Sequence, residues 1–68
     1  MDADIFSMSI RTFLKRVGMT SQQEIERAVA KAIKDGHLQG DEVLPVKMKL
    51  TLDGADLDIS FDGVLELD

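Results

Sequence analysis

Apolar side chains recur every three or four residues near the start of the chain, which is the spacing of an amphipathic helix. A first helix is therefore predicted from about Asp4 to Val17. Asp2 or Asp4 can cap its start, because a carboxylate accepts hydrogen bonds from free backbone amides. Gly18 is suited to the position after its last residue, where a left-handed conformation is common. The apolar positions of this segment are Phe6, Ile10, Phe13, Leu14 and Val17.

A second stretch of the same period predicts a second helix, from about Ser21 to Lys34. The letters "SQQE" fit a capping box, in which Ser21 and Glu24 satisfy each other's backbone amides. Gly36 is placed to end this helix. Because only Gly18, Met19 and Thr20 separate the two segments, the helices are expected to be neighbours in space. The second apolar stripe consists of Ile25, Ala28, Val29, Ala32 and Ile33.

The period changes to two after Pro45, in "VKMKLTLDGADLDISFDG". Pro45 cannot donate to a ladder, so it is expected at a strand start or on an edge. Asp53-Gly54 is a strong signal for a two-residue hairpin turn. That turn predicts these apolar cross-strand pairs: Leu52 with Ala55, Leu50 with Leu57, Met48 with Ile59, and Val46 with Phe61.

The other face of this hairpin carries alternating lysines and acids. The same turn places Thr51 opposite Asp56, Lys49 opposite Asp58, and Lys47 opposite Ser60. Opposite charges in such pairs stabilise a sheet by roughly 0.2–1 kcal/mol. The aspartates are therefore interpreted as the solvent side of a strand and not as a ligand cluster.

A third strand is expected through Leu65 to Leu67, after a turn at Asp62-Gly63. A two-residue turn there places Glu66 on the apolar face, whereas a bulged turn points Leu65 and Leu67 inward, and the bulged turn is preferred. The predicted fold is a single α+β domain over residues 1–68. It has two N-terminal helices packed on one face of a three-stranded antiparallel β-meander (α-α-β-β-β).

Charge and composition narrow the function. Net charge is −5, and residues 37–68 hold two Lys against eight Asp or Glu, which disfavours nucleic acid and anionic lipid as partners. The chain has no cysteine and no run of about 20 apolar residues that could span a membrane. Its acidic start is unlike a secretory signal. A cytoplasmic location is expected.

Few residues offer chemistry. His37, with Asp35, Asp41 and Glu42 nearby, is a weak candidate for a metal site, because zinc needs further fixed nitrogen or sulfur ligands. Asp53, Asp56, Asp58 and Asp62 do not follow the calcium-loop spacing, although weak cation binding by this acidic face stays open. No nucleophile-and-base set or phosphate-binding loop is present. No enzyme activity, cofactor, catalytic residue or metal site is predicted.

Two functions remain. The segment "FLKRVGMTSQQEIERAVAKAI" resembles a helix-turn-helix, and with a hairpin behind it a winged helix, which makes a nucleic-acid-binding domain the alternative function. Asp53 and Asp56 in the wing position argue against it, because DNA affinity depends on cationic contacts. The leading hypothesis is a protein-interaction or self-associating module. Ile5 and Met8 are its candidate contact residues, since they lie off the main apolar stripe, and a free sheet edge is a second candidate.

The stretches "DIFSMSIRTFLKRVGMTSQQEIERAV" and "GDEVLPVKMKLTL" resemble a family of short bacterial proteins that share a domain of unknown function. The resemblance covers nearly the whole chain. It implies the boundaries of one domain, and it brings no activity, cofactor or binding residue.

Overall fold

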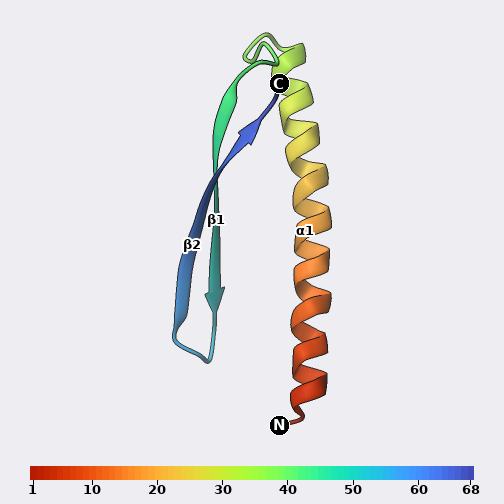
Figure 1. Ribbon diagram of the computed structural model, residues 1–68, viewed down its shortest axis with the longest axis vertical. Coiled ribbons are helices and arrows are strands. Elements are labelled where there is room, and N and C mark those ends of the chain that lie inside the picture. The colour runs from red at the N-terminus through yellow and green to blue at the C-terminus, as the bar shows by residue number, and fades with distance from the viewer. The chain divides into compact units, whose positions relative to one another are not determined.

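The computed structural model describes all residues, Met1–Asp68, and contains three elements. These are one helix, α1 (Ala3–Lys34), and two strands, β1 (Val43–Leu52) and β2 (Leu57–Glu66) (Figure 1). The chain divides into two compact units, Met1–His37 with the helix and Leu38–Asp68 with the hairpin. The predicted α-α-β-β-β order is wrong, because one helix replaces two and the sheet has two strands. The single domain over residues 1–68 stays a prediction.

The start of α1 is fixed by Asp2. Its Oδ1 accepts hydrogen bonds from the backbone amides of Asp4 at 3.0 Å and Ile5 at 3.1 Å. These amides belong to the first turn, which has no carbonyl partners inside the helix. The prediction of an aspartate cap is confirmed, and the cap is Asp2.

The helix runs through Gly18 without a break, which contradicts the predicted turn and the second helix start at Ser21. A glycine inside a helix costs only about 1 kcal/mol relative to alanine. Against that cost, Val17, Ser21 and Ile25 are spaced four apart, so an unbroken helix keeps the first apolar stripe on one face with Ile25, Ala28 and Ala32 of the second. Without a turn between two helices there is no helix-turn-helix, and the winged-helix interpretation has no structural basis.

The end of α1 is the predicted glycine cap. Gly36 has a φ of 83°, in the left-handed region. Its amide donates to the carbonyl of Ile33 at 3.1 Å, and the amide of His37 donates to the carbonyl of Ala32 at 2.8 Å. These two bonds are the Schellman pattern that satisfies the last helical carbonyls. His37 is thus part of the helix end.

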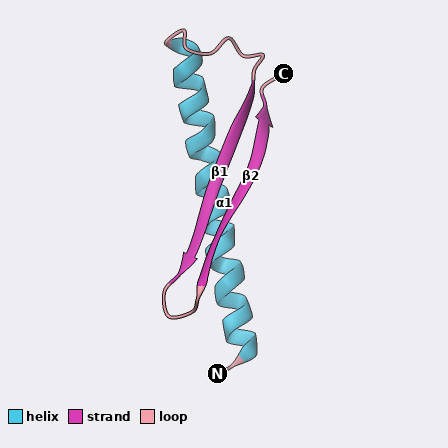
Figure 2. Cartoon of the chain, turned by 90° about the vertical axis from the view of Figure 1, so that its left-hand side faces the viewer, coloured by secondary structure: helices cyan, strands magenta, loops and turns pink.

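The hairpin pairs β1 with β2 antiparallel, but in a different register from the predicted one (Figure 2). The connection is four residues long, Asp53 to Asp56, with Gly54 at a φ of 86°. Each apolar residue of β1 therefore meets a residue two positions later than predicted: Leu52 faces Leu57, Leu50 faces Ile59, Met48 faces Phe61, and Val46 faces Gly63. A shift of two keeps every side chain on its face. The longer loop also puts Leu57, in place of the smaller Ala55, against Leu52.

The predicted turn at Asp62-Gly63 and the third strand are also wrong. β2 continues straight through Gly63 to Glu66, because β1 begins early enough, at Val43, to pair with this whole segment. Leu65 then faces Leu44 on the apolar side, as Leu65 was expected to do after a bulged turn. Pro45 lies in a strand whose outer side is free, in agreement with its expected edge position.

The row of acids lies where the alternation of the strand puts it. Asp58 and Asp62 alternate with Leu57, Ile59 and Phe61 along β2, so they occupy the opposite face. Lys49 Nζ lies 3.6 Å from an oxygen of Asp58. The residue directly opposite Lys49 is Ser60, so this ion pair is diagonal and not the direct pair predicted.

Changing Gly18 to alanine tests the continuity of α1. A side chain at this position meets no atom within 4 Å, so the Gly18→Ala variant should gain about 0.5–1 kcal/mol of stability from helix propensity alone. Thermal unfolding followed by circular dichroism at matched protein concentration measures this gain. If Gly18 formed a turn with a left-handed conformation, the Gly18→Ala variant would instead lose stability. Gly36→Ala is the matched control and should lose about 1 kcal/mol, because Gly36 does have a positive φ.

Candidate interaction surface

One apolar surface of the helical unit is a continuous row along one face of α1, here called the apolar stripe. Its members follow spacings of three and four from end to end of the helix, with one polar residue, Ser21, near the middle. No residue of the stripe is buried. Phe6, Ile10, Phe13 and Leu14 are all exposed. The apolar stripe consists of Phe6, Ile10, Phe13, Leu14, Val17, Ser21, Ile25, Ala28 and Ala32.

A second apolar surface lies on the other side of the same helix and is called the Met8 face. Residues two apart in a helix are about 200° apart in rotation, and Met8, Thr12 and Met19 each lie two residues from members of the stripe. Ile5 precedes Met8 by one turn. Ile5 is 65% exposed and Met8 is 69% exposed. The N-terminal half of α1 is therefore apolar on opposite sides.

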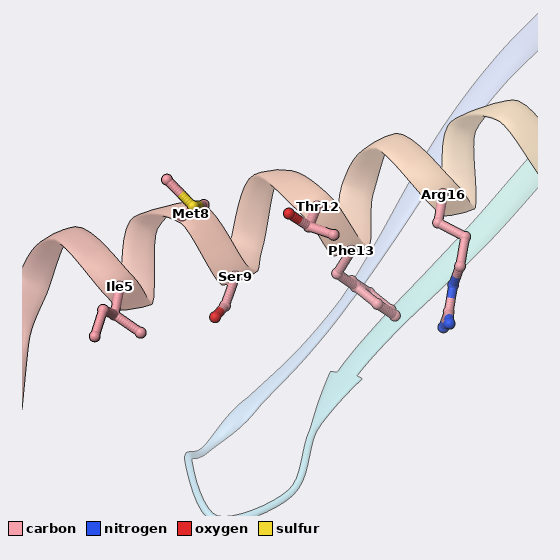
Figure 3. A pocket seen from close by; sticks show the side chains of 6 residues that line it. All are labelled: Ile5, Met8, Ser9, Thr12, Phe13 and Arg16. Atoms are coloured by element: carbon pink, nitrogen blue, oxygen red, sulfur yellow. The ribbon is translucent and has the colours of Figure 1, made fainter.

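A shallow hollow lies between the Met8 face and the apolar stripe, because its lining includes Met8 and Phe13, which point to different sides of the helix (Figure 3). The structure places both predicted contact residues, Ile5 and Met8, in its lining. Arg16 lies over the ring of Phe13, with its guanidinium carbon 5.7 Å from the ring centre, in a cation–π contact. The hollow has no histidine or carboxylate to act as a base. It is lined by Ile5, Met8, Ser9, Thr12, Phe13 and Arg16.

The polar sides of α1 carry short-range pairs between exposed side chains. Arg27 lies 2.8 Å from Glu24, and Lys31 lies 2.5 Å from Asp35. Gln22 donates to Glu26 at 3.0 Å. Exposed pairs of this kind stabilise a helix by only about 0.3–0.5 kcal/mol each.

The hairpin unit has its own apolar face. Its two rows of side chains come from alternate residues of both strands, and none of them is buried. Met48, Ile59 and Phe61 are exposed. A face made of two strands cannot enclose its own side chains. The apolar face consists of Leu44, Val46, Met48, Leu50, Leu52, Leu57, Ile59, Phe61 and Leu65.

The loop that precedes β1 is organised by Glu42. Its carboxylate accepts hydrogen bonds from the amides of Gln39 at 2.8 Å and Gly40 at 3.0 Å. Its own carbonyl accepts from Leu67 at 3.1 Å, one step beyond the ladder of β2. The bond from Gln39, supported by the one from Gly40, lowers the pKa of Glu42 below its ordinary value, because both favour the charged form.

The metal candidates are not brought together. No group of three or more His, Asp or Glu side chains is arranged to hold an ion. Asp35 pairs with Lys31, and Glu42 is engaged by the loop amides, so two acids near His37 have other partners. Asp53 and Asp56 lie in the hairpin loop, apart from the strand positions of Asp58 and Asp62.

Sequence reasoning missed the extent of the apolar stripe. It assigned Phe6, Ile10 and Leu14 to the apolar stripe of one short helix and Ile25 to the apolar stripe of a second helix. The available signal was the spacing of Val17, Ser21 and Ile25, which keeps these residues on one face of a helix across the expected break.

The state of Glu42 can be followed by titration. Since its pKa in the folded state is lowered, its stabilising effect on the loop is present above the unfolded pKa and is lost as pH falls through the folded pKa. An NMR titration should show the Glu42 carboxyl protonating at lower pH than an unperturbed glutamate. The Gln39 and Gly40 amide shifts should move with the same midpoint. In Glu42→Gln this step should vanish, and an ordinary glutamate pKa in the wild type would contradict the assignment.

Comparison with known proteins identifies the family to which the chain belongs. No helix of the chain combines the length and apolarity needed to cross a membrane. Curated proteins and solved structures gave no match to this chain. A family profile covers it from residue 1 to residue 68. The chain therefore belongs to DUF6494, a family of unknown function, as the resemblance noted in its sequence implied.

Proposed function

We propose that this protein is a non-enzymatic self-associating module, which completes its hydrophobic core with a second copy of itself. The observation that carries the proposal is that neither unit buries a residue within itself, although 44% of the residues are hydrophobic. Fully burying one large aliphatic or aromatic side chain stabilises a protein by about 1.5–3 kcal/mol. A unit that fully buries none of them has little to offset the entropy of ordering its backbone.

Neither unit supplies its own core. A lone helix is marginally stable in water and depends on packing of its apolar face. An isolated two-stranded hairpin is also marginal at best. With no cysteine, the chain has no disulfide to compensate. Association with another copy is the simplest source of the missing contacts, because each copy brings the same apolar faces.

The helix and the strands differ in length. The 32 residues of α1 extend for about 48 Å, at about 1.5 Å per residue. The ten residues of β1 extend for only about 34 Å. α1 is therefore longer than either strand, and the α1 of a second copy matches the whole length of its apolar stripe.

The Met8 face supports a second contact within the same proposal. It lies on the other side of α1, so a helix that packs through its apolar stripe still exposes Ile5 and Met8. We assign this face to a protein partner of the assembled module.

Sedimentation equilibrium tests the self-association. The wild type should associate, and Ile10→Glu should raise its dissociation constant at least about 100-fold, because each subunit loses a buried Ile worth about 1.5–3 kcal/mol. Gln23→Glu adds the same charge on the other side of α1 and should stay within about threefold of the wild type. A wild type that is monomeric from ~1 µM to ~1 mM contradicts the proposal.

The role of Ile5 and Met8 can be separated from self-association. The double variant Ile5→Ser/Met8→Ser should keep the helical circular dichroism of the wild type and its dissociation constant within about threefold, because the apolar stripe is unchanged. Sedimentation at several concentrations measures this. If the double variant dissociates as Ile10→Glu does, the Met8 face belongs to the self-association contact and the assignment to a separate partner is wrong.

A further inference from the structure

We infer that two copies of the protein pair their α1 helices antiparallel, stripe against stripe, about a two-fold axis that passes beside Met19. In this register Phe6 of one copy is level with Ala32 of the other, Ile10 with Ala28, Phe13 with Ile25, and Val17 with Ser21. The inference rests on the proposed self-association and adds its orientation and register. It depends on α1 being continuous from Ala3 to Lys34, so that all these residues share one face.

The sizes of the side chains favour this orientation. Four large members of the stripe, Phe6, Ile10, Phe13 and Leu14, lie in the first half of α1, and one, Ile25, lies in the second. The small members, Ser21, Ala28 and Ala32, all lie in the second half. An antiparallel pair therefore sets a larger side chain against a smaller one in three layers, Phe6 with Ala32, Ile10 with Ala28 and Val17 with Ser21, which favours an even separation of about 8–10 Å between the helix axes.

A parallel pair cannot achieve this evenness. It sets Phe6 against Phe6 and Phe13 against Phe13 at one end, and Ala28 against Ala28 and Ala32 against Ala32 at the other. The bulky end forces the helices apart, and the alanine end then loses contact, because interiors tolerate neither overlap nor gaps. The same pairing also sets Arg11, Lys15 and Arg16 against themselves.

Charge selects the register. Sliding one helix by a turn also aligns apolar positions, with Ile10 level with Ala32 and Val17 level with Ile25. That slide sets the three cations of residues 11–16 beside residues 26–31, which hold Glu26, Arg27 and Lys31 and have a net charge of +1. The proposed register sets them beside residues 22–27, which hold Glu24, Glu26 and Arg27 and have a net charge of −1.

Two further features agree with the proposed register. The slide would leave Phe6 without a partner, because its opposite position, Gly36, lies beyond the end of α1 at Lys34. Arg27, which is level with Arg11 in the proposed register, already has an acid partner, Glu24 of its own chain, 2.8 Å away.

The extent of the contact fits a stable pair. The members recur at intervals of 11 residues, as in Phe6, Val17 and Ala28, or Ile10, Ser21 and Ala32. This interval is close to the period of a straight helix, so the stripe keeps its direction along the whole element. A contact about 48 Å long and ~10 Å wide removes about 500 Å² of accessible surface from solvent on each partner. The total is ~1,000 Å², which is the lower bound for a specific interface.

Cysteine pairs test orientation and register together, and the wild type contains no cysteine that would interfere. Ile10→Cys with an affinity tag is mixed with untagged Ala28→Cys, and the mixture is oxidised and separated under denaturing conditions. The expected product is the tagged–untagged disulfide. Each variant oxidised alone should give at least about tenfold less dimer, because in an antiparallel pair a residue is far from its own copy.

The remaining outcomes are distinct. Self-disulfides of Ile10→Cys or Ala28→Cys indicate a parallel pair, and a preferred disulfide between Ile10→Cys and Ala32→Cys indicates the slid register. Each of these overturns the inference and leaves the proposed self-association standing. No disulfide in any mixture of a protein that still sediments as a dimer also overturns it. A wild type that sediments as a monomer overturns both.

A label outside the stripe avoids any loss of apolar contact. Spin labels on Ala3→Cys should be separated by about 48 Å along the helix axis in the antiparallel pair, because 32 residues of rise lie between residue 3 and its counterpart. In a parallel pair the two labels stay within ~20 Å, since only the spacing of the axes and the label arms separate them. A short distance from pulsed dipolar spectroscopy overturns the inference.

Discussion

The continuity of α1 through Gly18 is the constraint on which the rest of the structure depends. A helix places a side chain on one face only if the backbone between neighbouring turns is unbroken. Because Val17, Ser21 and Ile25 follow one another at intervals of four, the unbroken helix joins two short apolar segments into one stripe. A turn at Gly18 would divide this surface into two pieces that could pack on each other, and the chain would then hide most of what it now exposes.

The hairpin is subject to a related limit. Its strands alternate well, and its register sets apolar residues against apolar residues, as in Leu50 with Ile59 and Met48 with Phe61. Two strands nevertheless form a surface and not an interior. The pairing therefore determines which side chains are presented together, while the stabilisation of that face depends on what covers it. Both units of the protein share this property, and the proposed association is based on it and not on the chemistry of single residues.

The distribution of residue sizes along α1 gives the proposed association a direction. Most large side chains of the apolar stripe lie in the first half of the helix, and its small ones lie in the second half. They become complementary when the helix meets a copy of itself running the other way. In the proposed pair, the alternation of charge along the same helix limits the slide between the two copies. The proposed orientation and register thus use only the order of residues along α1.

Part of this protein could be predicted from its sequence alone. The periods of three to four and of two gave the element types, and the caps at Asp2 and Gly36 gave both ends of the helical region, because each depends only on residues within one turn. The faces of the hairpin were also predictable, since alternation survives a shift of two residues. Of the candidate site, the sequence identified Ile5 and Met8 as apolar residues off the main stripe.

The length of the hairpin loop and the end of β2 were decided by the pairing of the strands. Gly18, Asp53-Gly54 and Asp62-Gly63 are all local turn signals, and only the Asp53-Gly54 signal marks an actual turn. The Asp62-Gly63 signal is overridden by contacts that no local window contains, because a longer β1 offers pairing partners as far as Glu66. The Gly18 signal is overridden within the helix, where a glycine costs only about 1 kcal/mol. Sequence by itself determined which residues are apolar and at what period, and the assembled backbone decided which of them form one surface.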